Sequence, residues 1–141
     1  MKRKASAVWS GDLAGGQGTI SSDSGVLKDT PYSFKTRFED GNGTNPEELI
    51  AAAHAGCYSM ACSHELAGAG HTPERVATVA TVTLDKVEGG FAISAVHLEV
   101  DAHVPGIAQA DFERIANAAK EGCPISKVLN AEITMTTTLK A

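Results

Sequence analysis

The chain has 141 residues and a formal net charge of −5, and 43% of its residues are hydrophobic. This length fits one domain with a modest core, and the acidic balance gives no electrostatic reason to bind a phosphate backbone. Basic residues near the N-terminus precede no apolar segment, and the sequence has no uncharged apolar stretch of the ~18 residues that a membrane span requires. We therefore expect a single domain over residues 1–141 in a cytoplasmic protein that binds neither nucleic acid nor membrane.

The first 43 residues predict strands and turns. Glycine, serine, threonine and aspartate are frequent there, and short segments alternate apolar and polar side chains. The segments are residues 5–9, 18–21 and 32–39.

A long helix is predicted to follow. Asn45 can cap it, Pro46 suits its first position, and Glu48 can complete a capping box. The helix should reach Leu66 or Ala67, where a glycine-rich segment follows. Its first three turns are apolar on almost every face, which predicts a helix in the protein interior.

The second half of the chain mixes strands and helices. Residues 76–87 and 91–104 alternate with period two around a glycine turn, which predicts a β-hairpin. Residues 111–121 form an amphipathic helical pattern, and a short helix should begin at Pro124. Residues 131–140 predict a final strand. The fold class is therefore α+β.

Three cysteines do not fit a secreted disulfide framework and indicate a reducing compartment. Cys123 precedes a proline that opens a helix, so backbone N–H groups and the helix dipole favour its thiolate. Cys57 lies in an alanine-rich helix, where a free cysteine is more often a small core side chain than a nucleophile. Cys62 lies roughly 140° around the helix from Cys57, which indicates packing.

A zinc site is the alternative use of this helix. His54, Cys57, Cys62 and His64 are the right ligand types. However, His54 and His64 are separated by about 15 Å along the helix axis, which is too far for one coordination sphere. We expect no metal here and interpret His54 as a packed or hydrogen-bonded histidine.

Three charged residues near the helix start have ordinary explanations. Arg37 fits an exposed strand position, and Glu47 and Glu48 fit the dipole at a helix start. The capping box accounts for Glu48. The residues alone leave the role of Glu47 open.

The run Gly43-Thr44-Asn45-Pro46-Glu47-Glu48-Leu49, with Ala-His-Ala-Gly-Cys57 and Gly122-Cys123-Pro124, resembles the OsmC/Ohr family over almost the whole chain. Four further stretches are similar to its osmotically inducible protein C branch: residues 22–27, 84–87, 104–107 and 131–134. In the organic hydroperoxide resistance branch an arginine occupies an earlier glycine-rich position, whereas residues 15–18 of this chain contain none.

The resemblance implies a thiol-dependent peroxidase with an OsmC-like α+β fold, β-sheets around a long central helix, and an intertwined homodimer. It implies that Cys57 is the peroxidatic cysteine, Cys123 the resolving cysteine that forms a disulfide with it, and Arg37 with Glu47 the activating pair. The implied substrates are organic and, less efficiently, inorganic hydroperoxides. No haem, flavin or metal cofactor is implied, and the implied reductant is an external dithiol of the dihydrolipoyl type, such as a lipoylated protein.

Glu47 and Cys57 are ten residues apart, or about 15 Å along one helix, so they cannot touch within it. Either Arg37 and its loop lie between them, or the carboxylate approaches the cysteine of a second subunit. We predict the second arrangement.

Two other function classes remain open. One is a non-catalytic, stress-induced protein that binds small molecules in an apolar cleft. The other is a general disulfide reductase, which is disfavoured because the two cysteines are 66 positions apart rather than in a Cys-x-x-Cys motif.

Overall fold

A computed structural model describes residues 1–39 and 41–141, and the chain divides into two compact units, residues 1–49 and 50–141. Helix α1 (Pro46–Gly68) begins in the first unit and continues into the second. The described residues form both helices and β-sheets, which confirms the predicted α+β class. None of the helices among the described residues combines the length and hydropathy needed to cross a bilayer.

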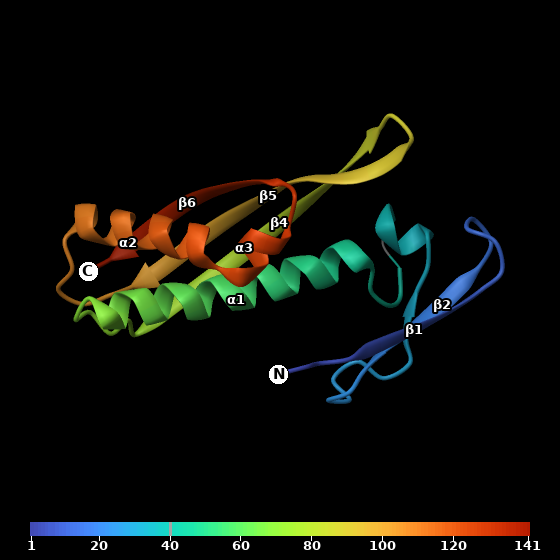
Figure 1. The fold of residues 1–141 in the computed structure, drawn as a ribbon, viewed down its shortest axis with the longest axis horizontal. Helices are drawn as coiled ribbons and strands as arrows, with labels where there is room; N and C mark the ends of the chain where they lie inside the picture. Colours follow the sequence, from blue (N-terminus) through green and yellow to red (C-terminus); the bar gives the residue numbers. More distant parts are fainter. Residues whose placement is uncertain (40) are drawn as a thin grey trace. The chain divides into compact units, whose positions relative to one another are not determined.

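The first unit contains an antiparallel sheet of three strands in the order β1-β2-β3 (Figure 1). The strands are β1 (Ala5–Ser10), β2 (Gln17–Ser22) and β3 (Thr30–Tyr32). Gly18 on β2 pairs with Trp9 on one side and Tyr32 on the other, and the two rings lie 5.4 Å apart. A Cβ atom on Gly18 would lie 2.5 Å from Tyr32 Cε1, so the ring contact requires glycine there.

The predicted strand over residues 32–39 is wrong beyond Tyr32, because a short 3-10 helix, η1 (Lys35–Arg37), forms instead. Ser33 and Thr36 exchange bonds: the Ser33 amide donates to Thr36 Oγ1 (3.0 Å) and the Thr36 amide donates to Ser33 Oγ (3.3 Å). Such local side-chain bonds satisfy the backbone groups that a strand would pair. Arg37 therefore lies on a turn rather than in a strand.

The start of α1 is capped as predicted, with one difference. Asn45 Oδ1 accepts a hydrogen bond from the Glu48 amide at 2.8 Å. The Glu48 carboxylate does not close the capping box; it accepts a bond from Thr44 Oγ1 at 2.6 Å. The Thr44 hydroxyl therefore takes the place of the Asn45 backbone amide as the partner of the Glu48 carboxylate.

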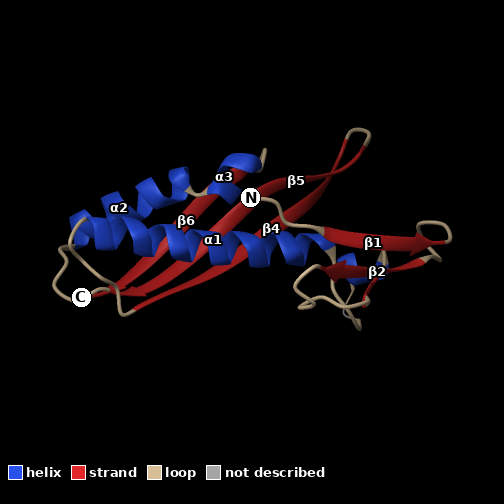
Figure 2. Cartoon of the chain, turned by 60° about the horizontal axis from the view of Figure 1, so that its bottom comes forward, coloured by secondary structure: helices blue, strands red, loops and turns tan. Residues whose placement is uncertain are grey.

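The second unit has a sheet in the order β4-β5-β6, with α1 and α2 on one of its faces (Figures 1 and 2). The predicted hairpin is confirmed: β4 (Arg75–Val87) pairs antiparallel with β5 (Gly90–His103), and Gly89 at the turn has φ 87°. β6 (Glu132–Lys140) pairs parallel with β5. Helices α2 (Gln109–Gly122) and α3 (Pro124–Val128) connect β5 to β6.

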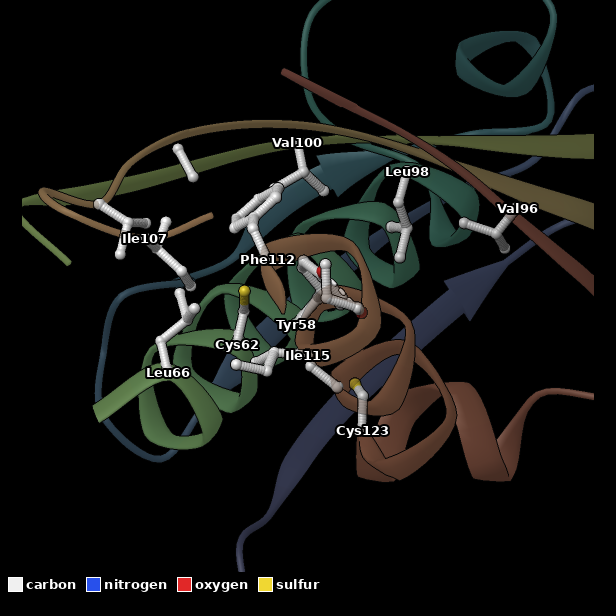
Figure 3. Packing of buried hydrophobic residues seen from close by; sticks show 14 residues of the cluster. Tyr58, Cys62, Leu66, Val96, Leu98, Val100, Ile107, Phe112, Ile115 and Cys123 are labelled. Atoms are coloured by element: carbon white, nitrogen blue, oxygen red, sulfur yellow. Dashed lines mark hydrogen bonds between the residues drawn. The ribbon is translucent and has the colours of Figure 1, made fainter. Parts of the chain in front are cut away.

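The hydrophobic core lies between these helices and the sheet. Figure 3 shows Tyr58, Cys62 and Leu66 of α1 facing Phe112 and Ile115 of α2. The buried residues of α1 recur every four positions, so one side of the helix is covered. The prediction of an interior helix is wrong for the described part of the single chain, because the other side is exposed. Its exposed residues include Ala52, Ala53, Gly56 and Met60.

Candidate active site

The second unit brings Cys57 and Cys123 together. Cys57 is half-buried on α1, and Cys123 is fully buried where α2 ends and α3 begins. The thiols are both free and lie close enough to interact by hydrogen bonding. Sixty-six residues of chain therefore close into a site with two adjacent sulfur atoms.

Cys123 has the environment of a thiolate. Burial acts to raise its pKa, but the amide of Ser126, the thiol of Cys57, the hydroxyl of Ser126 and the amide of Ile125 together outweigh burial and lower it. These donors favour the anion because a thiolate accepts hydrogen bonds more strongly than a neutral thiol does. The sequence-based expectation for this helix junction is confirmed.

Cys57 has the opposite tendency. Burial raises its pKa, the amide of Ile125 opposes this, and Cys123 raises the pKa further. Because the thiols interact, they titrate as a pair, and the first negative charge belongs on Cys123. Among the described residues, no cationic side chain contributes to the pKa shift of either thiol, and the charge of the Cys123 thiolate is itself one cause of the raised pKa of Cys57. Within this environment the neutral thiol of Cys57 is therefore favoured over its thiolate.

A pocket of about 370 Å³ opens beside Cys57. Its apolar walls are formed by Met60, Ala61, Ala119 and Pro124, and its polar residues include His64 and Glu65. An alkyl group can fill such a pocket while its polar end meets the thiol.

The first unit brings Arg37 and Glu47 together. Arg37 Nε lies 3.0 Å from Glu47 Oε1 and 3.2 Å from Oε2, and the side chains are 29% and 13% exposed. Partial burial makes this charge-assisted contact stronger than an exposed ion pair. The same guanidinium helps to line a pocket of about 220 Å³ with the aromatic rings of Trp9, Tyr32 and Phe34. The cysteine pair and the ion pair belong to different units.

His54 is packed and hydrogen-bonded, as predicted. It is fully buried, and its Nε2 lies 2.8 Å from Ser126 Oγ. Cys62 is also fully buried, which confirms its packing role, and burial raises its pKa. Ser126 was not among the residues predicted from the sequence. Its available signal was its place three residues after Cys123 at a helix start, where amides face the preceding turn.

Within the described ranges, no three His, Cys, Asp or Glu side chains converge as metal ligands would.

Comparison with known proteins identifies the relatives of this site. A family model described as "OsmC-like protein" matches residues 39–138. The chain belongs to this family. Peroxiredoxin OsmC of Escherichia coli strain K12 is 53% identical over 139 residues, covering 99% of this chain and 97% of that protein.

Two members of the OsmC-like family are named for organic hydroperoxide resistance. The protein of that name from Xanthomonas axonopodis pv. citri is 32% identical over 104 residues, covering 70% of this chain and 68% of the relative. The crystal structure of organic hydroperoxide resistance protein OhrB of Bacillus subtilis matches with a TM-score of 0.70 and 27% identity, covering 96% of this chain and 98% of that one. The OsmC-like fold predicted from the sequence is confirmed.

Proposed function

We propose that the chain is a cysteine-based peroxidase that reduces organic hydroperoxides, and inorganic ones less efficiently. The observation that carries this proposal is the pair of free, interacting thiols beside an apolar pocket. The names of the relatives, peroxiredoxin and organic hydroperoxide resistance protein, support the same chemistry.

Cys57 is the peroxidatic residue in this proposal, because it lines the pocket and is the more exposed of the two. Its thiolate attacks one peroxide oxygen, the O–O bond breaks, and the other oxygen leaves as an alcohol after taking a proton. Cys57 is then a sulfenic acid. Cys123 attacks that sulfur, an S–S bond forms, and the hydroxyl leaves as water with one proton.

The reductive half-reaction uses an external dithiol of the dihydrolipoyl type, such as a lipoylated protein. The dithiol must attack Cys57, because Cys123 is 0% exposed. Cys123 is then the leaving group, and the donors that stabilise its thiolate speed this exchange. Neither half-reaction requires a haem, flavin or metal.

Arg37 supplies the cation that Cys57 lacks, and Glu47 holds the guanidinium through its Nε. A guanidinium stabilises the thiolate and can donate to the peroxide oxygen on which charge develops. The carboxylate reduces the conformational freedom that Arg37 would otherwise lose during reaction.

We further propose that Glu47 acts on the Cys57 of a second subunit in an intertwined homodimer. Ten residues on one helix separate them by about 15 Å, which excludes direct contact within α1. Mixed dimers of Cys57→Ser and Glu47→Ala protomers test this arrangement, because one of the two sites then contains both residues only if they come from different chains. Verified mixed dimers that recover no activity would contradict it.

Mass spectrometry without reductant, after one equivalent of cumene hydroperoxide, tests the peroxidase proposal. We expect a Cys57–Cys123 disulfide in the wild type and a Cys57 sulfenic acid in Cys123→Ser. Unchanged thiols would instead favour a non-catalytic small-molecule-binding protein. The matched control is Cys62→Ala, which should form the same disulfide as the wild type.

A further inference from the structure

Two polar side chains lie near Cys123 in the core of the second unit. The Ser126 hydroxyl, three residues after Cys123, meets the imidazole of His54 at 2.8 Å, and the same hydroxyl is among the groups that lower the pKa of Cys123. His54 is 0% exposed and sits one helical turn before Cys57 on α1. Neither this buried imidazole nor the serine bonded to it makes or breaks a covalent bond in the proposed peroxidase reaction.

The hydrogen bonds fix the direction of this chain of groups. His54 Nδ1 is buried without a partner among the described residues. A buried orphan N–H is rarer than an orphan acceptor, so we assign the proton to Nε2 and leave Nδ1 as a bare acceptor. Nε2–H then donates to Ser126 Oγ. The serine hydrogen is left to donate to Cys123 Sγ.

With the hydrogen bonds in this direction, the serine hydroxyl stabilises the neutral thiol and the thiolate of Cys123 to different extents. A hydroxyl whose oxygen already accepts a hydrogen bond is a stronger donor through its own proton. It therefore stabilises a sulfur anion more than it stabilises a neutral thiol. Burial also lowers the pKa of His54, so the ring stays neutral and keeps one donor and one acceptor nitrogen.

We propose that His54 and Ser126 are positioning residues for the resolving step: the imidazole orients the Ser126 hydroxyl, and the hydroxyl holds Cys123 as a thiolate aimed at the sulfenic acid of Cys57. The inference rests on the proposed peroxidase function. The step it assists forms the Sγ–Sγ bond, breaks the S–O bond of Cys57, and releases hydroxide, which takes a proton to give water. Cys123 is oxidised and Cys57 is reduced.

The test separates the two chemical steps in a single turnover. Wild-type and variant proteins, fully reduced and freed of reductant, are mixed with one equivalent of cumene hydroperoxide and quenched at increasing times. Mass spectrometry then follows formation of the Cys57 sulfenic acid and its conversion to the disulfide. Ser126→Ala and His54→Leu remove the donors, whereas Ser126→Thr and His54→Gln retain a hydroxyl and an N–H donor.

We expect Ser126→Ala and His54→Leu to slow disulfide formation by at least about threefold. The loss is moderated because a less stabilised thiolate is also more nucleophilic. Formation of the sulfenic acid should change less than formation of the disulfide, and excess peroxide should give more Cys57 sulfinic acid because the intermediate survives longer. Ser126→Thr and His54→Gln should restore most of the disulfide rate. Ser59→Ala is the matched control, since Ser59 is a part-buried serine bonded to Thr78 in the same unit.

If Ser126→Ala and His54→Leu both slowed disulfide formation by less than about threefold, the inference would be overturned. So would an equal slowing of both chemical steps, or retained-donor variants as slow as the donor-deleted ones, because those results indicate a merely structural role. Failure of the peroxidase proposal can be told apart from failure of this inference, because in that case the wild type itself forms no disulfide. That result would overturn the inference as well.

Discussion

The two units of the chain differ in what holds their reactive groups. The second unit positions its thiols within a hydrophobic core that includes Tyr58, Leu98 and Phe112, each 0% exposed. In the first unit, Thr44 is the one buried residue among residues 1–39 and 41–49. The Arg37–Glu47 ion pair of this unit lies on segments joined by local hydrogen bonds, such as the one from Thr36 Oγ1 to the Thr44 carbonyl, and not in a hydrophobic core. A unit of this size with so little buried surface has little hydrophobic stabilisation of its own.

The sharpest test of the comparison is loss of the nucleophile from the second unit. Cys57→Ser should lower the turnover of cumene hydroperoxide at least ~10³-fold, because a serine hydroxyl is not ionised at neutral pH. A peroxide-consumption assay with excess dithiol measures this, and Cys62→Ala is the control that should retain turnover. Substantial activity in Cys57→Ser would show that the chemistry does not reside in the thiol pair.

Loss of the cation from the first unit should have a smaller effect. We expect Arg37→Ala to lower kcat/KM about 10²-fold, because one charged donor to the developing anion is removed. Arg37→Lys should recover only part of this, since an ammonium cannot reproduce the planar contact with Glu47. Steady-state kinetics provide the measurement. Arg75→Ala is the matched control, because Arg75 pairs with Asp101 on the exposed surface of the second unit.

Equal activity of Arg37→Ala and Arg75→Ala would contradict the proposed role of Arg37.

Core substitutions should sharpen the contrast in stability. Leu98→Ala should lower the free energy of unfolding by about 3 kcal/mol, because a fully buried side chain leaves a cavity. Ile20→Ala on β2 should cost about 1 kcal/mol, because Ile20 is only partly buried in the single chain. Urea titration followed by circular dichroism measures both. A larger cost for Ile20→Ala would show that the first unit gains a substantial core on assembly.

The smallest predicted effect concerns pH. Burial lowers the pKa of His54 in the folded protein, so between this value and the ordinary value of about 6.5 the unfolded chain binds a proton that the native state does not. The stability that the neutral ring provides is therefore present above the ordinary pKa and is lost as pH falls through the folded value. His54→Gln cannot titrate, so its urea midpoint should fall less than that of the wild type between about pH 7.5 and about pH 5.5. An equal fall in both would contradict this.

Much of the fold could be predicted from local patterns in the sequence. The Asn45 cap, the hairpin with its glycine turn, and the start of α3 at Pro124 follow from neighbouring residues, and the structure confirms them. Helix α2 was predicted over residues 111–121 and begins two residues earlier, at Gln109. The strand predicted over residues 32–39 was wrong because alternation cannot reveal the paired bonds of Ser33 and Thr36. The parallel pairing of β6 with β5 was not predicted, because pairing partners distant in the sequence leave no local signal.

The sequence by itself determined the residue types of the proposed site: one cysteine in a long helix, one at a junction between two helices, an arginine, and a carboxylate at a helix start. Only the tertiary structure decided that Cys57 meets Cys123, that Glu47 holds Arg37, and that His54 reaches Ser126. The tertiary structure also decided that the pKa of Cys57 is raised while that of Cys123 is lowered. The physical reason is that pKa values and hydrogen-bond partners depend on distances in space, whereas sequence patterns report only neighbours along the chain.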